Sequence, residues 1–418
     1  MKNNEDKKSG GPKRTGPALA AVDFGGAATR ALVAEVLPDQ SLRLLGVGEV
    51  PARGIREGRV VNIEEATASL GNAIKEAEIM SNYRVQSVWP AVSGEHLDGA
   101  DASGSTVISE MSVSMSDISK VKAMARAEVA HRPGIKVIAT LDRDYQLDGQ
   151  TGIHQPLGMS GHKLSGDVHL ILASSNALSD MEKCLLQCGA SIEQQFIFAG
   201  LAAAKSVLSK DEKQLGVCVA DIGAGTTDVV VYSQGVVWQT FSFAMASDDI
   251  HSDIAHMHHA SLDSAERAKK QIGVVGDGGE FISLFDAGGS GESRQSMPVV
   301  RDTISHRVDE ILETIGEKLE PFGGEHPLSG GLVLVGDGAL LPGIAEAAAA
   351  KLNMPTRVGR PRYRGQNHEI VASPRFAVGI GLLEMAAVYH RDTERVRRQE
   401  NIWLRLTNWL RDTFADKA

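Results

Sequence analysis

The chain has 418 residues, and at about 150 residues per domain this length predicts two or three domains. Lys and Arg number 43 against 53 Asp and Glu, so the formal net charge is −10. That balance argues against a general nucleic-acid-binding protein, because phosphate contacts need a surplus of basic side chains on the docking face. With 42% hydrophobic and 23% charged residues, the composition is that of a folded protein rather than a disordered one.

Membrane spans and disulfides are not predicted. Residues 1–17 are polar, so we expect a disordered tail rather than a signal peptide, and no run of about 20 apolar residues follows. An odd number of cysteines favours a reducing compartment. Cys184 and Cys188 stand four residues apart, a spacing open to a metal pair. Buried small side chains are the simpler interpretation, because no further ligands lie at metal spacing.

In the first half of the chain, apolar runs predict strands, and apolar residues at helical spacing predict helices. The predicted strands are 18–24, 30–36, 42–50, 85–92, 135–141, 167–174 and 191–198. The predicted helices are 64–80, 116–130 and 176–188. From about Ser93 the pattern changes and becomes rich in turns, and only the strand at 167–174 restores it. We therefore expect a small subdomain inserted at 93–173.

The second half continues with strands and helices around another Gly-rich turn. The predicted strands are 215–222, 228–233, 235–243 and 331–336, and the predicted helices are 248–259, 262–270, 300–320, 342–352 and 374–389. The Gly/Ser-rich stretch 273–293 is expected to be a loop, and residues 390–400 a charged linker. A strand, a Gly turn and a returning strand occur twice, at Asp23 and at Asp221, which indicates an internal duplication.

Three Gly-containing turns follow buried strands and have the residue types of a phosphate site. They are Asp23-Phe24-Gly25-Gly26, Asp221-Ile222-Gly223-Ala224-Gly225-Thr226-Thr227-Asp228 and Val335-Gly336-Asp337-Gly338-Ala339. Small side chains let backbone N–H groups approach a phosphate, and an Asp at a strand end holds Mg²⁺, usually through water. The first turn alone also fits an ordinary hairpin with an Asx cap. Three such turns in order predict a nucleotide site.

Several longer stretches resemble one protein family. They are RGIREGRVVN, QPLGMSGHKL, LSDMEKCLLQCGASIEQQFIFAGLAAAKSVL and QLGVCVADIGAGTTDVVVY. With the three turns, they resemble FtsA, the bacterial cell-division family of the actin-like ATPase superfamily, over about residues 18–415. The resemblance implies an α/β, actin-like (ribonuclease H-like, duplicated) two-lobed fold with an inserted small α+β subdomain and a C-terminal amphipathic helix. The insert favours FtsA or the FtsA-like pilus protein PilM over a rod-shape actin or a sugar kinase.

The resemblance also implies how the chain divides into domains. The expected parts are a disordered tail at 1–17, a first lobe (1A) at 18–92 and 174–214, an inserted subdomain (1C) at 93–173, a second lobe (2A) at 215–246 and 328–389, subdomain 2B at 247–327, a charged linker at 390–400 and a membrane-targeting amphipathic helix at 401–415.

Nucleotide contacts carry over from the family residue by residue. The implied ATP-binding residues are Asp23, Gly25, Gly26, Asp221, Gly223, Gly225, Thr226, Thr227, Glu266, Lys269, Gly336, Gly338 and Ala339. Asp23 and Asp221 would hold Mg²⁺ through water, and Asp228 also matches the second turn. Glu266 and Lys269 stand three apart on one helix face, and a solvent-exposed ion pair is the open alternative for them.

The chain departs from the family pattern at two of the turns. Gly26 and Ala28 stand where a hydroxyl residue and a Lys are usual, so a positive charge is lost unless Arg30 points inward. Asp337 replaces the second of two glycines, and its carboxylate would repel a phosphate if it faced the nucleotide. Residues 198–204 offer no acidic or amide side chain to position an attacking water. No catalytic residue is therefore assigned, and weak or absent ATPase activity is expected.

The segment 401–415 (NIWLRLTNWLRDTFA) predicts an amphipathic helix that lies on a membrane surface. Its apolar arc supplies the implied membrane anchors Ile402, Trp403, Leu406, Trp409, Leu410 and Phe414. Trp favours the bilayer interface, and flanking Arg suits anionic headgroups. The alternative is a helix packed on the body or forming a dimer, against which the charged linker argues.

The resemblance implies a peripheral protein of the cytoplasmic face of the inner membrane at the division septum. There it would bind ATP, tether the FtsZ ring to the membrane and recruit later division proteins. Expected partners are the FtsZ C-terminal tail on 247–327, later division proteins through 93–173, further copies of the chain and anionic lipids, with no nucleic acid. The competing hypothesis is an actin-like ATPase of another class, either PilM-like or a kinase- or chaperone-like enzyme with a general base in a substrate pocket.

Overall fold

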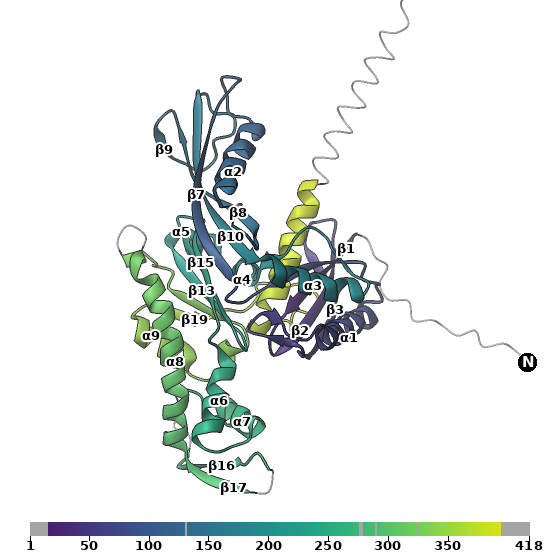
Figure 1. Cartoon of the computed structure of the whole chain (residues 1–418), viewed down its shortest axis with the longest axis vertical. Coiled ribbons are helices and arrows are strands. Elements are labelled where there is room, and N and C mark those ends of the chain that lie inside the picture. The colour runs from purple at the N-terminus through teal and green to yellow at the C-terminus, as the bar shows by residue number, and fades with distance from the viewer. Residues whose placement is uncertain (1–15, 130–131, 276–278, 289–290, 324–326, 394–418) are drawn as a thin grey trace, which may run out of the picture.

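The computed structural model describes residues 16–129, 132–275, 279–288, 291–323 and 327–393. Two large sheets form the cores of two lobes that lie side by side (Figure 1). The N-terminal lobe, in purple, is on the right of Figure 1, and the second sheet runs through the centre. Two projections extend from this body in opposite directions, one in blue and one in green.

A six-stranded sheet forms the first lobe. Its strands are β1 (Ala18–Phe24), β2 (Ala28–Val36), β3 (Leu42–Pro51), β6 (Ser87–Val92), β11 (Ser191–Ile192) and β12 (Ile197–Phe198). The order is β11-β6-β1-β2-β3, with β12 also paired to β6. The strand predicted at 191–198 is therefore two short strands, because the exposed polar residues 193–195 leave the sheet.

Three helices and a small hairpin from the first half of the chain pack around this sheet. They are β4 (Ile55–Arg56), β5 (Arg59–Val60), α1 (Ile63–Ser81), α3 (Ser175–Gln187) and α4 (Ala199–Val207). Asn62 caps α1 by accepting from the N–H groups of Glu64 and Glu65. A Cβ at Gly48 of β3 would lie 1.9 Å from the carbonyl oxygen of Ala73 in α1. Only glycine therefore permits the close packing of α1 on β3.

The second sheet has nine strands and continues into the insert. Its second-lobe strands are β13 (Val217–Ile222), β14 (Thr227–Ser233), β15 (Val236–Phe243), β18 (Leu332–Val335) and β19 (Thr356–Val358). Its insert strands are β7 (Leu97–Val107), β8 (Ile135–Leu147), β9 (Gln150–Ile153) and β10 (Lys163–Ser174), with α2 (Met115–Val129) packed on β7 and β10. The order is β19-β18-β13-β14-β15-β7-β10-β8-β9, joined at the pair Phe241–Asp98.

The predicted duplication is present in the topology. β1 pairs antiparallel with β2 and parallel with β6, and β13 pairs antiparallel with β14 and parallel with β18. Asp23 lies opposite Arg30 in the first hairpin, and Asp221 lies opposite Asp228 in the second. Each lobe therefore presents the same hairpin turn at the end of its first strand.

The second lobe and the green projection carry most of the remaining helices. They are α5 (Lys210–Leu215), α6 (Ser247–Met257), α7 (Leu262–Ile272), α8 (Met297–Leu319) and α9 (Ile344–Leu352), with short 3₁₀ turns η1 (Glu320–Gly323) and η2 (Gly338–Leu340). The prediction of an irregular loop at 273–293 is wrong in part. Residues 281–285 and 292–296 form the hairpin β16–β17. Ile282 and Leu284 alternate with exposed residues and are buried in the hydrophobic core of the second lobe, which we call the second core.

The C-terminal part of the described chain returns to the first lobe. The 3₁₀ turn η3 (Pro374–Phe376) leads into a helix at 377–393, whose Ile380, Leu383 and Ala386 join the core of that lobe. The helix predicted at 374–389 thus continues into the first four residues of the expected linker. Among the described residues, no helix is both long and apolar enough to cross a membrane.

Candidate functional site

The two hairpin turns meet between the lobes. A Cβ at Gly26 would lie 3.3 Å from the Cβ of Ala224, so the turns are in close approach. They line a cavity together with the turn after β18. The predicted residues that line it are Asp23, Gly25, Gly26, Asp221, Gly223, Gly225, Thr226 and Gly336. Residues from three distant parts of the sequence are thus brought together as predicted, and we call this space the phosphate cavity.

A larger cavity of about 400 Å³ adjoins the phosphate cavity. The two share the lining residues Ala27, Arg30, Ala224, Asp337 and Arg375. Predicted contacts Glu266 and Lys269, both on α7, line this second cavity. Its volume lies within the range of about 300–1,000 Å³ typical of small-molecule sites. We call it the base cavity.

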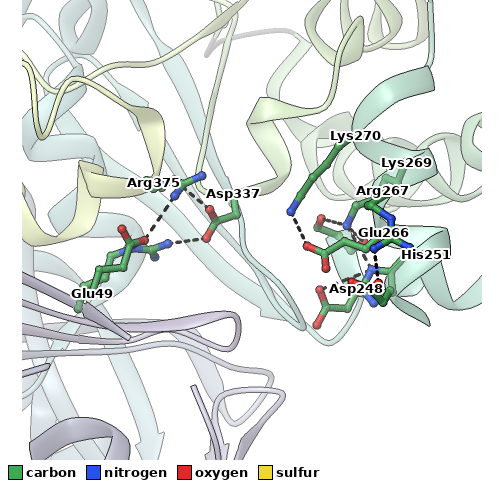
Figure 2. Close-up of polar contacts among 12 residues, drawn as sticks. Glu49, Asp248, His251, Glu266, Arg267, Lys269, Lys270, Asp337 and Arg375 are labelled. Atoms are coloured by element: carbon green, nitrogen blue, oxygen red, sulfur yellow. Dashed lines mark hydrogen bonds and ion pairs between the residues drawn. The ribbon is translucent and has the colours of Figure 1, made fainter. Parts of the chain in front are cut away.

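Lys269 and Glu266 do not form the exposed ion pair that was the alternative for them. Lys269 is buried, and its Nζ donates to the carbonyl oxygen of Ser247 at 2.9 Å and to the Ser247 hydroxyl at 2.8 Å. Burial lowers its pKa. Glu266 instead accepts from Lys270 at 2.6 Å, four residues on (Figure 2). Lys269 is therefore held against Ser247 of α6 in the wall of the base cavity, and Glu266 lines the same cavity while it pairs with Lys270.

Arg30 points inward and lies at the centre of an ion-pair network. Its Nη2 is 2.8 Å from Asp337 Oδ2, its Nε is 2.9 Å from Glu49 Oε1, and its Nη1 is 3.9 Å from Asp23 Oδ2. Arg375 pairs with Glu49 at 3.5 Å and with Asp337 at 3.3 Å. Figure 2 shows Glu49, Asp337 and Arg375 across from the α6–α7 residues of the base cavity. The network joins first-lobe strands to the second-lobe turn.

Buried carboxyl groups give the phosphate cavity an unusual electrostatic character. Burial raises the pKa of Asp23 to about 6 despite the nearby Arg30, and burial also raises the pKa of Asp228 to about 6. Asp221 is raised well above its usual pKa by burial and by its neighbours Asp228 and Asp23. A cation that enters the cavity therefore stabilises the ionised form of these carboxyl groups.

Metal binding was assigned to Asp23 and Asp221, acting through water. Within the described ranges, no group of three or more His, Cys, Asp or Glu side chains is placed to hold a metal ion. Mg²⁺ commonly binds through one or two carboxylates together with substrate phosphates and waters. Two buried strand-end carboxylates therefore fit a Mg²⁺ that arrives with a nucleotide.

Three predicted contacts do not line either cavity. Thr227 is buried and donates its hydroxyl to the Met245 carbonyl oxygen at 2.7 Å. Gly338 packs on Ile222, where a Cβ would meet its side chain at 2.4 Å, and Ala339 belongs to the second core. These three residues pack beneath the turns, on the side away from the two cavities.

Several lining residues were missed by the sequence reasoning, including polar and charged residues outside the predicted turns and α7. Among these missed residues are Glu49, Glu57, Ser93 and Arg375. Ser93 lies 2.7 Å from the Thr226 hydroxyl, and Glu57 forms the β4–β5 turn with a positive φ of 48°. The stretch RGIREGRVVN, which contains Glu57, was already noted for its resemblance, and its Gly58 was the available signal for a turn.

Comparison with known proteins decides the family. A family model described as cell division protein FtsA matches residues 218–381, and one described as an SHS2 domain inserted in FtsA matches 94–172. The cell division protein FtsA of Pseudomonas aeruginosa is 33% identical over 374 residues, covering 88% of this chain and 89% of that protein. The FtsA of Escherichia coli K12 is 32% identical over 414 residues, covering 95% and 98%. The chain belongs to the FtsA family.

Solved structures agree on the fold of this FtsA-family chain. A PilM–PilN type IV pilus biogenesis complex matches with a TM-score of 0.61 at 18% identity, covering 88% of this chain and 98% of that one. MreB5 of Spiroplasma citri bound to ADP matches with a TM-score of 0.52 at 16% identity, covering 90% and 98%. The predicted actin-like two-lobed fold with its insert is confirmed. The residues predicted to anchor the chain to a membrane lie outside the described residues; they are Ile402, Trp403, Leu406, Trp409, Leu410 and Phe414.

Proposed function

We propose that this FtsA-family chain binds ATP with Mg²⁺ between its lobes and tethers the FtsZ division ring to the cytoplasmic membrane. The observation that carries the nucleotide proposal is the meeting of the two duplicated turns, at Asp23 and Asp221, on one cavity. Backbone N–H groups at small residues suit phosphates, and the adjoining base cavity has room for a nucleoside. Similar folds with bound ADP and AMPPNP, both of MreB5, are consistent with this assignment.

Each part of the site has a distinct task in this proposal. Gly25 and Gly225 let the phosphates approach the backbone of the two turns, and Thr226 supplies a hydroxyl. Asp23 and Asp221 would hold Mg²⁺ through water, and this ion supplies positive charge that offsets the phosphates. Glu266 and Lys269 would face the ribose and base from α7. No residue is assigned to position an attacking water.

The expected domain roles complete the proposal. The tail would be 1–17, lobe 1A 18–92 and 174–214, insert 1C 93–173, subdomain 2B 247–327 and the membrane helix 401–415. Lobe 2A, expected at 215–246 and 328–389, and the linker, expected at 390–400, would both give up the helix at 377–393, which packs in the core of the first lobe. The FtsZ C-terminal tail would bind subdomain 2B, later division proteins would bind the insert, and further copies of the chain would stack into filaments. The membrane helix would hold the assembly at the cytoplasmic face of the membrane, at the division septum.

Calorimetric titration with MgATP tests the nucleotide site. Wild type should release or absorb heat, and Asp221→Ala should abolish the signal. Asp211→Ala, at an exposed Asp of α5, is the matched control and should bind as wild type does. Absence of heat in wild type would refute nucleotide binding. Phosphate release is expected to stay below ordinary enzyme rates of about 1–10³ s⁻¹.

Sedimentation with liposomes containing anionic lipids tests the tether. The full chain should co-sediment, whereas a chain truncated after residue 400 should stay in the supernatant. Trp403→Glu should weaken binding, and Asn408→Glu, on the polar face of the expected helix, serves as the charge-matched control. Equal sedimentation of the full and truncated chains would refute membrane binding through 401–415.

A further inference from the structure

Arg30 and Asp337 contact one another at the border of the phosphate and base cavities. We propose that they form a bridge that ATP displaces: Asp337 holds the Arg30 guanidinium when the site is free, and a phosphate group takes the place of Asp337 in the complex. Arg30 then supplies the positive charge that binds the phosphate, and Asp337 lowers the affinity for ATP by competing for Arg30. This inference rests on the nucleotide binding proposed above.

Arg30 is placed to contact a phosphate at the first turn. It lies opposite Asp23 in the β1–β2 register, and a Cβ at Gly25 would lie 3.6 Å from Arg30 Nη1. Its side chain is only 6% exposed and lines both cavities. Arg30 and Arg375 are the two cationic side chains among the residues that line the phosphate cavity. A guanidinium also presents a fork of donors that suits phosphate oxygens.

Asp337 occupies the partner position that a phosphate would take. Its Oδ2 accepts from Arg30 Nη2 at 2.8 Å, and its side chain borders both cavities. A carboxylate and a phosphate carry like charge and compete for the same guanidinium donors. ATP binding therefore has to break the Arg30–Asp337 pair, which weakens the measured affinity.

The surrounding charges make the exchange possible without leaving either group unpaired. Arg30 keeps Glu49, which binds its Nε at 2.9 Å, and Asp23, which lies 3.9 Å from its Nη1, so that only Nη2 changes partner. Asp337 keeps Arg375, whose Nε lies 3.3 Å from its other oxygen, Oδ1. Since an uncompensated buried charge is what makes the loss of an ion pair costly, these second partners lower the cost of the exchange.

A double-mutant cycle measured by MgATP titration of the full chain tests the bridge. Asp337→Asn keeps the shape of the side chain, and the φ of −68° at this position suits any residue. We expect it to raise ATP affinity about tenfold, a change of about 1.4 kcal/mol. Arg30→Met should lower affinity at least tenfold. In the double variant the gain from Asp337→Asn should disappear, because it acts through Arg30.

Controls separate the bridge from simpler explanations. Arg30→Lys keeps the charge and should recover part of the lost affinity, and Asp211→Asn should change nothing. A gain from Asp337→Asn that persists at full size in the Arg30→Met background would mean direct repulsion of phosphate, and it would overturn the bridge. Unchanged or weaker binding by Asp337→Asn in a chain that binds ATP would overturn the bridge alone. Absence of ATP binding in every variant would overturn both the bridge and the proposed nucleotide site.

Discussion

Replacing Asp23 with Asn should stabilise the nucleotide-free protein at neutral pH and leave it unchanged in acid. Asp23, the penultimate residue of β1, lines the phosphate cavity, and burial raises its pKa to about 6. The unfolded chain has the ordinary value of 3.8. Between these values the folded chain binds more protons than the unfolded chain, so this group makes the folded state less stable as the pH rises from about 4 to about 6.

The size of the effect follows from the shift. A raise of about 2 units corresponds to about 3 kcal/mol, present in full above pH 7 and absent below pH 4. The Asn side chain resembles the protonated Asp at every pH. The free energy of unfolding of Asp23→Asn should therefore match wild type near pH 4 and exceed it by up to about 3 kcal/mol at pH 7.5.

Urea unfolding in EDTA at pH 4, 5.5 and 7.5 measures this difference. Asp39→Asn is the control of opposite sign: Asp39 is exposed, and hydrogen bonds from Ser41 lower its pKa. That substitution should slightly destabilise the protein at pH 7.5. If Asp23→Asn is less stable than wild type at pH 7.5, the Arg30 pairing of Asp23 outweighs its burial, and the reasoning is refuted.

Three further substitutions test the packing and the contacts of the site. Gly336→Ala places a Cβ 2.4 Å from Asp221 Oδ1 at a φ of +86°, so it should abolish ATP binding by calorimetry and cost about 1–3 kcal/mol of stability in urea; wild-type affinity would contradict this. Lys269→Met should weaken ATP binding at least tenfold, whereas Lys351→Met on the exposed side of α9 should leave the affinity unchanged. If Lys269→Met binds ATP as tightly as wild type does, Lys269 does not contact the nucleotide. Gly381→Ala brings a Cβ within 1.7 Å of the carbonyl oxygen of Ala202 in α4, and neither residue lines the cavity. This substitution should lower the free energy of unfolding by about 1–3 kcal/mol. An unfolding curve identical to that of wild type would contradict this expectation.

Local patterns in the sequence predicted most of the elements. Residues 18–24 and 217–222 are buried along their whole length apart from Ala18, so their strands read as continuous apolar runs. Helix α1 was predicted within one residue at each end, because its apolar residues recur at helical spacing. The two hairpin turns of the site were predictable for the same reason, since they follow directly after those strands. The features that could be predicted are those set by residues close to one another in the sequence.

The remaining features depend on contacts between distant segments. Arg30 and Asp337 lie 307 residues apart, and nothing in the sequence fixes their approach before the lobes pack. The insert joins the second sheet through one ladder pair, Phe241–Asp98, and through side-chain contacts of Arg143 and His169 with β15, which leave no periodic signal in the sequence. In the hairpin at 281–296, five-residue strands in a Gly-rich stretch were too short for their alternation to stand out.

The two departures from the family pattern are physically connected. The resemblance implies a Lys where this chain has Ala28, and Arg30 supplies a cation two residues further along β2. A buried guanidinium needs carboxylate partners, and Asp337 in the third turn is one of them at 2.8 Å. Both departures make this region more negative, one by the loss of a cation and the other by an added carboxylate, and Arg30 offsets part of that change. Introducing Lys at position 28 and Gly at position 337 together should therefore shift the local charge by +2, against +1 for either change alone.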